Sequence, residues 1–111
     1  MEKIIVVEED PIIALDLLDM LQTTFGTAVI EHLPMPTALD SVVAGASNLL
    51  ALIVERLPQD MTADIKAALA RMTVVVTNLP DASMRAILPT AMFVERPFEP
   101  SSIAAMIKGR S

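Results

Sequence analysis

The stretch KIIVVEEDP, residues 3–11, carries the strongest indications of the fold. Its aliphatic run, residues 4–7, is short and rich in β-branched side chains, which is typical of a strand buried on both faces of a parallel sheet. Asp10 followed by Pro11 indicates the start of a helix, because Asp is a favoured N-cap and proline suits the first helical position. The stretch therefore predicts a strand, an acidic turn and a helix.

Strand and helix patterns alternate along the rest of the chain. Apolar residues from Ala14 to Phe25 recur at helical spacing, and Gly26 ends that pattern. Further strands are predicted at residues 28–31, 49–54, 73–77 and 91–95, and further helices at residues 36–46, 62–72, 81–88 and from residue 99 onward. Five strands alternating with five helices predict an α/β fold, (βα)5, with a doubly wound, five-stranded parallel sheet of flavodoxin-like order 2-1-3-4-5.

Composition limits the class of protein. A length of 111 residues suits one domain, residues 1–111, and a hydrophobic content of 53% excludes intrinsic disorder. The net charge of −6, without a basic cluster, argues against nucleic-acid binding. No apolar run reaches the ~20 residues that cross a bilayer, and no signal peptide is visible, so we expect a cytoplasmic protein without membrane contact. Without Cys, and with His32 as the single histidine, a thiol nucleophile and a His-rich metal cluster are excluded.

Charged and hydroxyl side chains follow the predicted strands. Because parallel strands end at the same edge of a sheet, we expect these side chains to meet there. Crowded carboxylates at such an edge would either hold a cation such as Mg²⁺ or be solvated loop charges. The residues concerned are Glu8, Glu9, Asp10, Glu55, Arg56, Thr77, Asn78, Glu95 and Arg96.

Four segments in this order resemble the receiver domain of two-component response regulators: residues 3–11, Leu57-Pro58, residues 74–77 and residues 93–98. The resemblance covers nearly the whole chain. It implies that Glu8 and Glu9 stand where receivers hold Mg²⁺, although the second of these positions is usually Asp. It also implies a switch hydroxyl at Thr77, a switch aromatic at Phe93, and Arg96 in place of the usual Lys.

The resemblance fails at the phosphoacceptor. In the family an Asp lies four residues before the Pro of the Leu-Pro element, and counting back from Pro58 gives Val54. A slip of one residue gives Glu55 instead, and the sequence leaves open which of the two occupies the acceptor position. Val has no nucleophilic oxygen, and Glu is one methylene too long for a site built around Asp. We therefore expect no enzyme activity and no cofactor, with at most a weak Mg²⁺ site at Glu8 and Glu9.

Arg96 is expected to replace the electrostatic role of a metal by pairing with Glu55, Glu8 or Glu9, since a guanidinium binds carboxylates bidentately. The sequence thus predicts a degenerate, phosphorylation-independent receiver that acts through a protein partner. The resemblance implies a histidine kinase, another receiver, an output domain or a second copy as that partner. Two alternatives are a receiver phosphorylated on Glu55 and a module of a longer kinase or regulator.

The contact surface is expected on the face formed by the fourth helix, the fifth strand and the fifth helix, which receivers commonly use. A homodimer through this face is one form of that contact. The face is predicted to carry an apolar patch, adaptable because of its methionines. Its members are Met84, Ile87, Phe93 and Met106.

Overall fold

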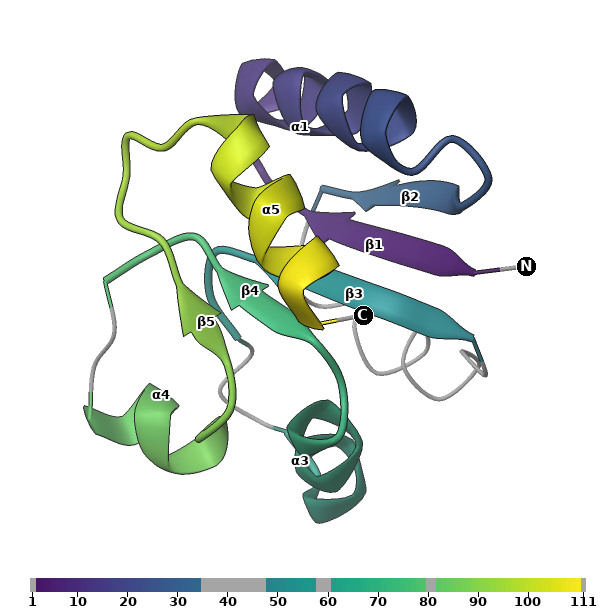
Figure 1. Ribbon diagram of the computed structural model, residues 1–111. Helices are drawn as coiled ribbons and strands as arrows, with labels where there is room; N and C mark the ends of the chain where they lie inside the picture. The colour runs from purple at the N-terminus through teal and green to yellow at the C-terminus, as the bar shows by residue number, and fades with distance from the viewer. Residues whose placement is uncertain (1, 35–47, 58–60, 80–81, 111) are drawn as a thin grey trace.

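The computed structural model describes residues 2–34, 48–57, 61–79 and 82–110 (Figure 1). The helix predicted at residues 36–46 lies outside the described residues. The elements follow the predicted alternation, and their bounds are β1 (Lys3–Val7), α1 (Pro11–Thr24), β2 (Val29–Leu33), β3 (Leu49–Val54), α3 (Ala63–Ala70), β4 (Val74–Val76), α4 (Ala82–Ile87), β5 (Met92–Phe93) and α5 (Pro100–Arg110).

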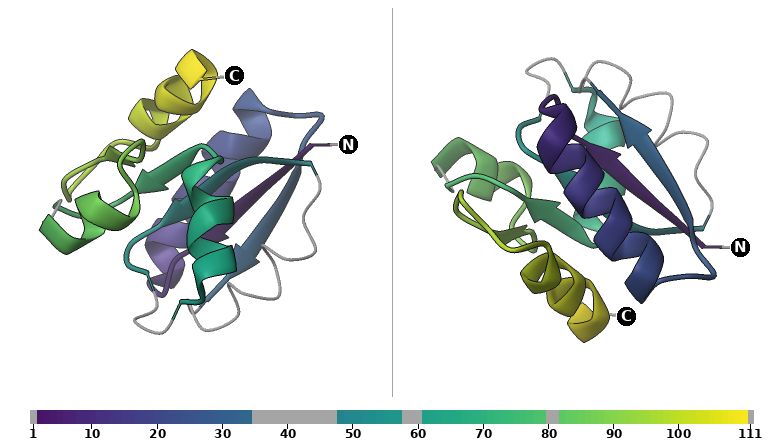
Figure 2. Two further views of the ribbon diagram at one scale, coloured as in Figure 1. Left: turned by 90° about the horizontal axis from the view of Figure 1, so that it is seen from below. Right: turned by 90° about the horizontal axis from the view of Figure 1, so that it is seen from above.

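The strands form one five-stranded parallel sheet with the order β2-β1-β3-β4-β5, which confirms the predicted topology. The last residues of the central strands are in register, since Val7 pairs with Val54 and Val54 pairs with Val76. Helices α1 and α5 lie on one face of this sheet and α3 lies on the other (Figure 2). The loops that follow β1, β3 and β4 therefore start side by side.

Two apolar clusters, one on each face of the sheet, form the core. Successive residues of β1 enter opposite clusters: Ile4 and Val6 pack on the side of α1 and α5, whereas Ile5 and Val7 pack on the side of α3 and α4. Burial on both faces explains why the strands are continuously aliphatic. Each fully buried aliphatic side chain contributes about 1.5–3 kcal/mol to folding.

The start of α1 has the predicted cap. The Asp10 carboxylate accepts hydrogen bonds from the backbone N–H groups of Ile12, at 2.9 Å, and Ile13, at 3.4 Å, and Pro11 is the first helical residue. A cap so close to the end of β1 leaves only Glu8, Glu9 and Asp10 between strand and helix. These residues are therefore held at the carboxyl edge of the sheet.

The strands at the β4–β5 side are shorter than predicted. β5 spans Met92–Phe93 instead of residues 91–95, and β4 spans Val74–Val76 instead of residues 73–77. The last backbone hydrogen bond between the two strands runs from the Val94 N–H to the Val76 carbonyl, and the side chain of Arg96 then reaches the Thr77 carbonyl. Polar residues that the sequence placed in strands thus belong to the edge of the sheet.

Two leucines of α1 provide a test of this packing. Leu17 lies on the core-facing side of α1 and is 1% exposed, while Leu15 on the same helix is 68% exposed. We expect Leu17→Ala to lower the free energy of unfolding by about 2–5 kcal/mol, because it leaves a cavity in the core. Leu15→Ala should change it by less than about 0.5 kcal/mol. Urea denaturation of both variants checks this, and equal losses would contradict the placement of α1.

Candidate functional site at the strand ends

Glu8 is a buried carboxylate at the end of β1. Glu8 is 2% exposed, and each of its two carboxylate oxygens accepts a hydrogen bond. Oε2 accepts a hydrogen bond from the backbone N–H of Asp10 at 3.0 Å, and Oε1 accepts one from Nη2 of Arg96. The backbone carbonyl of Glu8 lies 2.9 Å from Nε2 of His32, at the end of β2. Burial of this charge is therefore compensated by a cation and by hydrogen bonds.

Arg96 is the cation that joins three strand ends. Besides Glu8, its Nη2 lies 3.2 Å from Oε2 of Glu55 and 3.1 Å from Oγ1 of Thr77. Its Nε donates a hydrogen bond to the Thr77 carbonyl at 2.9 Å. With 28% of the side chain exposed, Arg96 is shielded enough for these charge-assisted contacts to be strong. We call Glu8, Glu55, Thr77 and Arg96 the strand-end site.

Thr77 fixes the position of β4 within this site. It is 1% exposed, and its backbone N–H donates a hydrogen bond to the carbonyl of Val54 at 2.9 Å. Its hydroxyl and its carbonyl both accept from Arg96. The residue expected to be a switch hydroxyl is thus held in place from two sides.

The geometry distinguishes Val54 from Glu55. Val54 is the last residue of β3 and is fully buried in the core cluster on the side of α3 and α4. Because Val7 pairs with Val54, the residues that follow them, Glu8 and Glu55, come next to each other at the edge. Both bind the same guanidinium nitrogen. Glu55 is therefore the side chain that β3 presents to the strand-end site.

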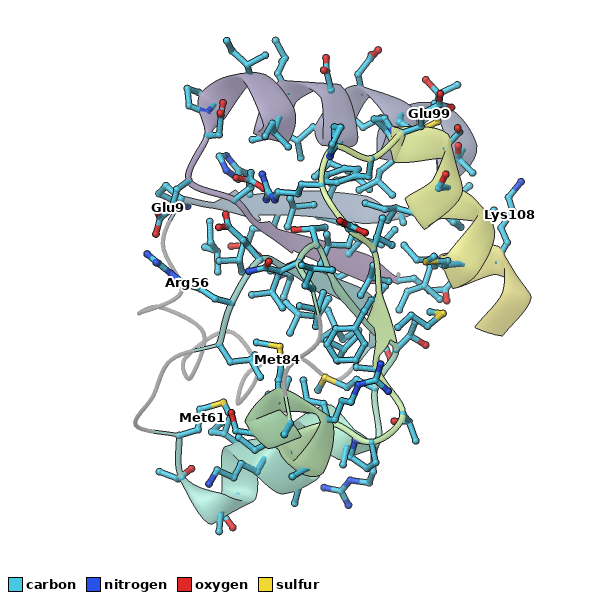
Figure 3. The ribbon with its side chains drawn as sticks, turned by 90° about the vertical axis from the view of Figure 1, so that its left-hand side faces the viewer. Glu9, Arg56, Met61, Met84, Glu99 and Lys108 are labelled. Atoms are coloured by element: carbon cyan, nitrogen blue, oxygen red, sulfur yellow. The ribbon has the colours of Figure 1, made fainter. Side chains whose placement is uncertain are left out.

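Glu9 does not join this site. Its Oε1 lies 2.6 Å from Nη2 of Arg56, and the two side chains point toward one another at the surface (Figure 3). Arg96 thus pairs with two of its three expected partners, Glu8 and Glu55. The third, Glu9, pairs with Arg56 instead. The pairing of Glu9 with Arg56 was not predicted, although both residues follow strands that are neighbours in the expected order.

The side chains present do not fit a divalent cation. Mg²⁺ needs several free oxygens around one point, whereas both oxygens of Glu8 are engaged and Glu9 turns away toward Arg56. Within the described ranges, no group of three or more His, Asp or Glu side chains could hold a metal ion. The guanidinium of Arg96 occupies the place between the carboxylates that a cation would need.

The four residues expected to form an apolar patch lie on two faces of the sheet. Met84, Ile87 and Phe93 pack against the cluster beneath α3 and α4, and Arg85 lies 5.6 Å over the Phe93 ring. Met106 packs against the opposite cluster, because α5 covers the other face. Each of the four is partly buried, and the sheet separates Met106 from the other three. Figure 3 shows Met84 beside the lower helices, away from α5.

Several solved structures with the same fold are receiver domains. Matches include the receiver domain of a DNA-binding response regulator from Colwellia psychrerythraea 34H, with a TM-score of 0.70, 15% identity and coverage of 99% of this chain and 98% of that one. A CheY-like receiver from Methanospirillum hungatei JF-1 has a TM-score of 0.70 at 13% identity, covering 99% and 93%. A receiver domain of a signal transduction histidine kinase from Syntrophus aciditrophicus has a TM-score of 0.69 at 19% identity, covering 98% and 89%.

The sequence itself matches no protein-family model and no curated protein. At these low identities the structural likeness establishes the fold, and this fold is the flavodoxin-like arrangement of receiver domains. None of the helices among the described residues is long and apolar enough to cross a membrane.

Replacing the central arginine tests the electrostatics of the strand-end site. Arg96→Ala should lower the free energy of unfolding by about 1–3 kcal/mol, because Glu8 would stay buried without its cation. Arg56→Ala is the matched control, since its ion pair with Glu9 is exposed and worth at most about 1 kcal/mol. Chemical denaturation measures both values. Equal stabilities of Arg96→Ala and the wild type would show that Arg96 is only a solvated surface charge.

The same variant tests whether Arg96 substitutes for a metal. In Arg96→Ala, the carboxylates of Glu8 and Glu55 would face each other without a counter-charge, and their oxygens suit Mg²⁺. We expect Mg²⁺ to raise the melting temperature of Arg96→Ala more than that of the wild type or of Arg56→Ala, at matched ionic strength. Identical shifts in all three proteins would argue against this substitution.

Proposed function

We propose that this protein is a receiver-like signalling module that works without phosphorylation, by binding a protein partner. The observation that carries this proposal is the position of Arg96, whose guanidinium lies between Glu8 and Glu55 and binds both. The receiver domains that share the fold include one from a response regulator and one from a histidine kinase, which supports a role in two-component signalling.

The strand-end site is poorly suited to phosphoryl transfer. Transfer to a carboxylate requires an unhindered oxygen in line with the donor and a cation that neutralises the developing charge on the phosphoryl group. Glu55 instead contacts Arg96 at 3.2 Å, and the oxygens that would hold Mg²⁺ have other partners. Val54 has no nucleophilic atom and is fully buried. We infer that the protein is not an enzyme and needs no cofactor.

Arg96 also gives a physical basis for a constant signalling state. It connects the ends of β1, β3 and β4 through Glu8, Glu55 and Thr77. Separating any of these strand ends would leave a charge or a hydrogen-bonding group without its partner. The strand-end site therefore favours one conformation, whereas a phosphorylated switch needs two of similar free energy. A partner would recognise this fixed shape.

One observation favours a different function, namely phosphorylation on Glu55. Its side chain is 36% exposed at the carboxyl edge, so a phosphoryl donor can reach it. Phosphorylation would require Arg96 to leave Glu55 and stabilise the phosphoryl oxygens instead. The two functions differ in whether a covalent adduct forms.

Intact mass spectrometry after incubation with acetyl phosphate and Mg²⁺ separates them. We expect no phosphoryl adduct, and we expect beryllofluoride, which mimics an acyl phosphate, to leave amide chemical shifts unchanged. Glu55→Gln is the matched control, because it keeps the size of the side chain and removes the acceptor. A stoichiometric, hydroxylamine-labile adduct on the wild type that is absent from Glu55→Gln would refute the proposal and establish the alternative.

A further inference from the structure

Glu8 is held by its backbone as well as by its carboxylate. Its N–H donates a hydrogen bond to the Leu33 carbonyl at 3.1 Å, and its carbonyl lies 2.9 Å from Nε2 of His32. Both partners belong to β2, the strand at the edge of the sheet. The polar atoms of this buried residue therefore all have partners, the backbone pair on β2 and the carboxylate pair at Asp10 and Arg96.

The side chain of His32 continues the contact between β1 and β2 past the end of the strand pairing. β1 ends at Val7, which pairs with Leu33, so the carbonyl of Glu8 lies beyond the last pair. His32 pairs with Val6, and paired residues of neighbouring parallel strands point to the same face of the sheet. The imidazole thus lies on the α1 side of the sheet and reaches forward to Glu8.

The chemistry of the two groups gives this hydrogen bond its direction. A carbonyl oxygen only accepts, so Nε2 of His32 is the donor and carries the hydrogen. Without the imidazole, the carbonyl would lose its partner in a residue that is 2% exposed, where water has little access. The free energy of this contact therefore opposes a shift of the Glu8 backbone.

The position of Arg96 depends on Glu8, because packing does not confine the arginine on every side. A hollow of about 350 Å³ lies beside the first turns of α1 and is lined in part by Arg96 and Phe98, with the guanidinium 5.6 Å over the Phe98 ring. The hollow leaves room for the arginine side chain, so the groups that bind the guanidinium must hold it in place. The buried carboxylate among these groups is that of Glu8.

We propose that His32 is a positioning residue of the strand-end site. By donating Nε2–H to the Glu8 carbonyl, it fixes the backbone from which the buried carboxylate reaches Arg96. This inference deepens the proposed function, on which it rests, because it adds the edge strand β2 to the strand ends that are held in one arrangement. A displacement of β2 would reach Arg96 through His32 and Glu8.

The side chain of Arg96 supplies the readout for a test. Its Nε–H donates to the Thr77 carbonyl at 2.9 Å, so this hydrogen should exchange slowly with solvent and give a separate signal in 15N NMR of the full chain. Arg96→Lys identifies the signal by its loss. If the Glu8 backbone shifts, the guanidinium loses its fixed position and the exchange of this hydrogen becomes faster.

Two variants with the same amide group but different reach test His32. In His32→Gln the amide nitrogen is as many bonds from Cβ as Nε2 of the imidazole, whereas in His32→Asn it is one bond closer and falls short of the Glu8 carbonyl. We expect His32→Asn to make the exchange of the Arg96 hydrogen about tenfold faster, the effect of losing one hydrogen bond, and His32→Gln to keep it near the wild-type rate.

Ile30→Ala is the control for a general loosening of β2. Ile30 lies on the same strand and packs against the same face of the sheet as His32, but its side chain has no donor for Glu8. This variant should leave the exchange of the Arg96 hydrogen near the wild-type rate. Circular dichroism verifies that each variant is folded.

The imidazole of the wild type gives a second measurement. The 15N shifts of its neutral form should place the hydrogen on Nε2, because the Glu8 carbonyl accepts it. This measurement needs no substitution, so it tests the contact even where a variant does not fold.

Four results would overturn the inference. The first is a neutral imidazole with its hydrogen on Nδ1, and the second is an unchanged exchange rate in His32→Asn. The others are an equal acceleration in His32→Gln and an equal acceleration in Ile30→Ala, which would show that any loosening of β2 has this effect. None of these results involves a phosphoryl adduct, so an adduct on Glu55 refutes the proposed function independently.

Discussion

The ion pair between Glu8 and Arg96 determines the arrangement of the carboxyl edge of the sheet. A carboxylate that is 2% exposed is costly unless a cation and hydrogen-bond donors compensate for its lost hydration. Arg96 provides that cation from the far end of the sequence, and the backbone of Asp10 provides a further donor. The same guanidinium also binds Glu55 and Thr77. The arginine that compensates the buried charge of Glu8 therefore also holds the ends of β1, β3 and β4 together.

This arrangement changes what the fold can do at its carboxyl edge. In an open α/β sheet, this edge is where ligands and catalytic groups collect. Here the counter-charge belongs to the chain itself, so the carboxylates are neutralised without help from solution. The guanidinium of Arg96 neutralises the carboxylates at any metal concentration, whereas a metal ion would do so only when enough of it is present in solution. The protein's own side chains thus hold this edge together.

Much of the fold could be predicted from local patterns. The aliphatic runs indicated buried parallel strands, and Asp10-Pro11 indicated the helix that starts beside Glu8. The pairing of Arg96 with strand-end carboxylates followed from the convergence of parallel strand ends. Choosing between Val54 and Glu55 was beyond the sequence, because counting from Pro58 assumes a fixed loop length. In the structure, Glu55 contacts Arg96, whereas Val54 is fully buried at the end of β3.

The remaining differences concern surfaces, which periodicity describes poorly. A helical repeat identifies the face that contacts the core, but it does not require the opposite face to be polar, so the exposure of Ile12 and Leu15 was not predicted. The four residues of the expected interface are divided between the two sides of the sheet for a related reason. Its members were chosen by position along the chain, whereas α4 and α5 pack on opposite sides of the sheet and carry Met84 and Met106 with them.

Arg96 belongs to two surfaces at once. It binds Glu8 and Glu55 at the strand ends, and it lines the hollow beside α1, where its guanidinium lies 5.6 Å over the Phe98 ring. A molecule that binds at one of these surfaces and moves the Arg96 side chain would change the free energy of binding at the other surface. By thermodynamic reciprocity the two effects are equal in size, whichever ligand arrives first. Arg96 is thus the one side chain that would transmit such an effect between the strand-end site and the hollow beside α1.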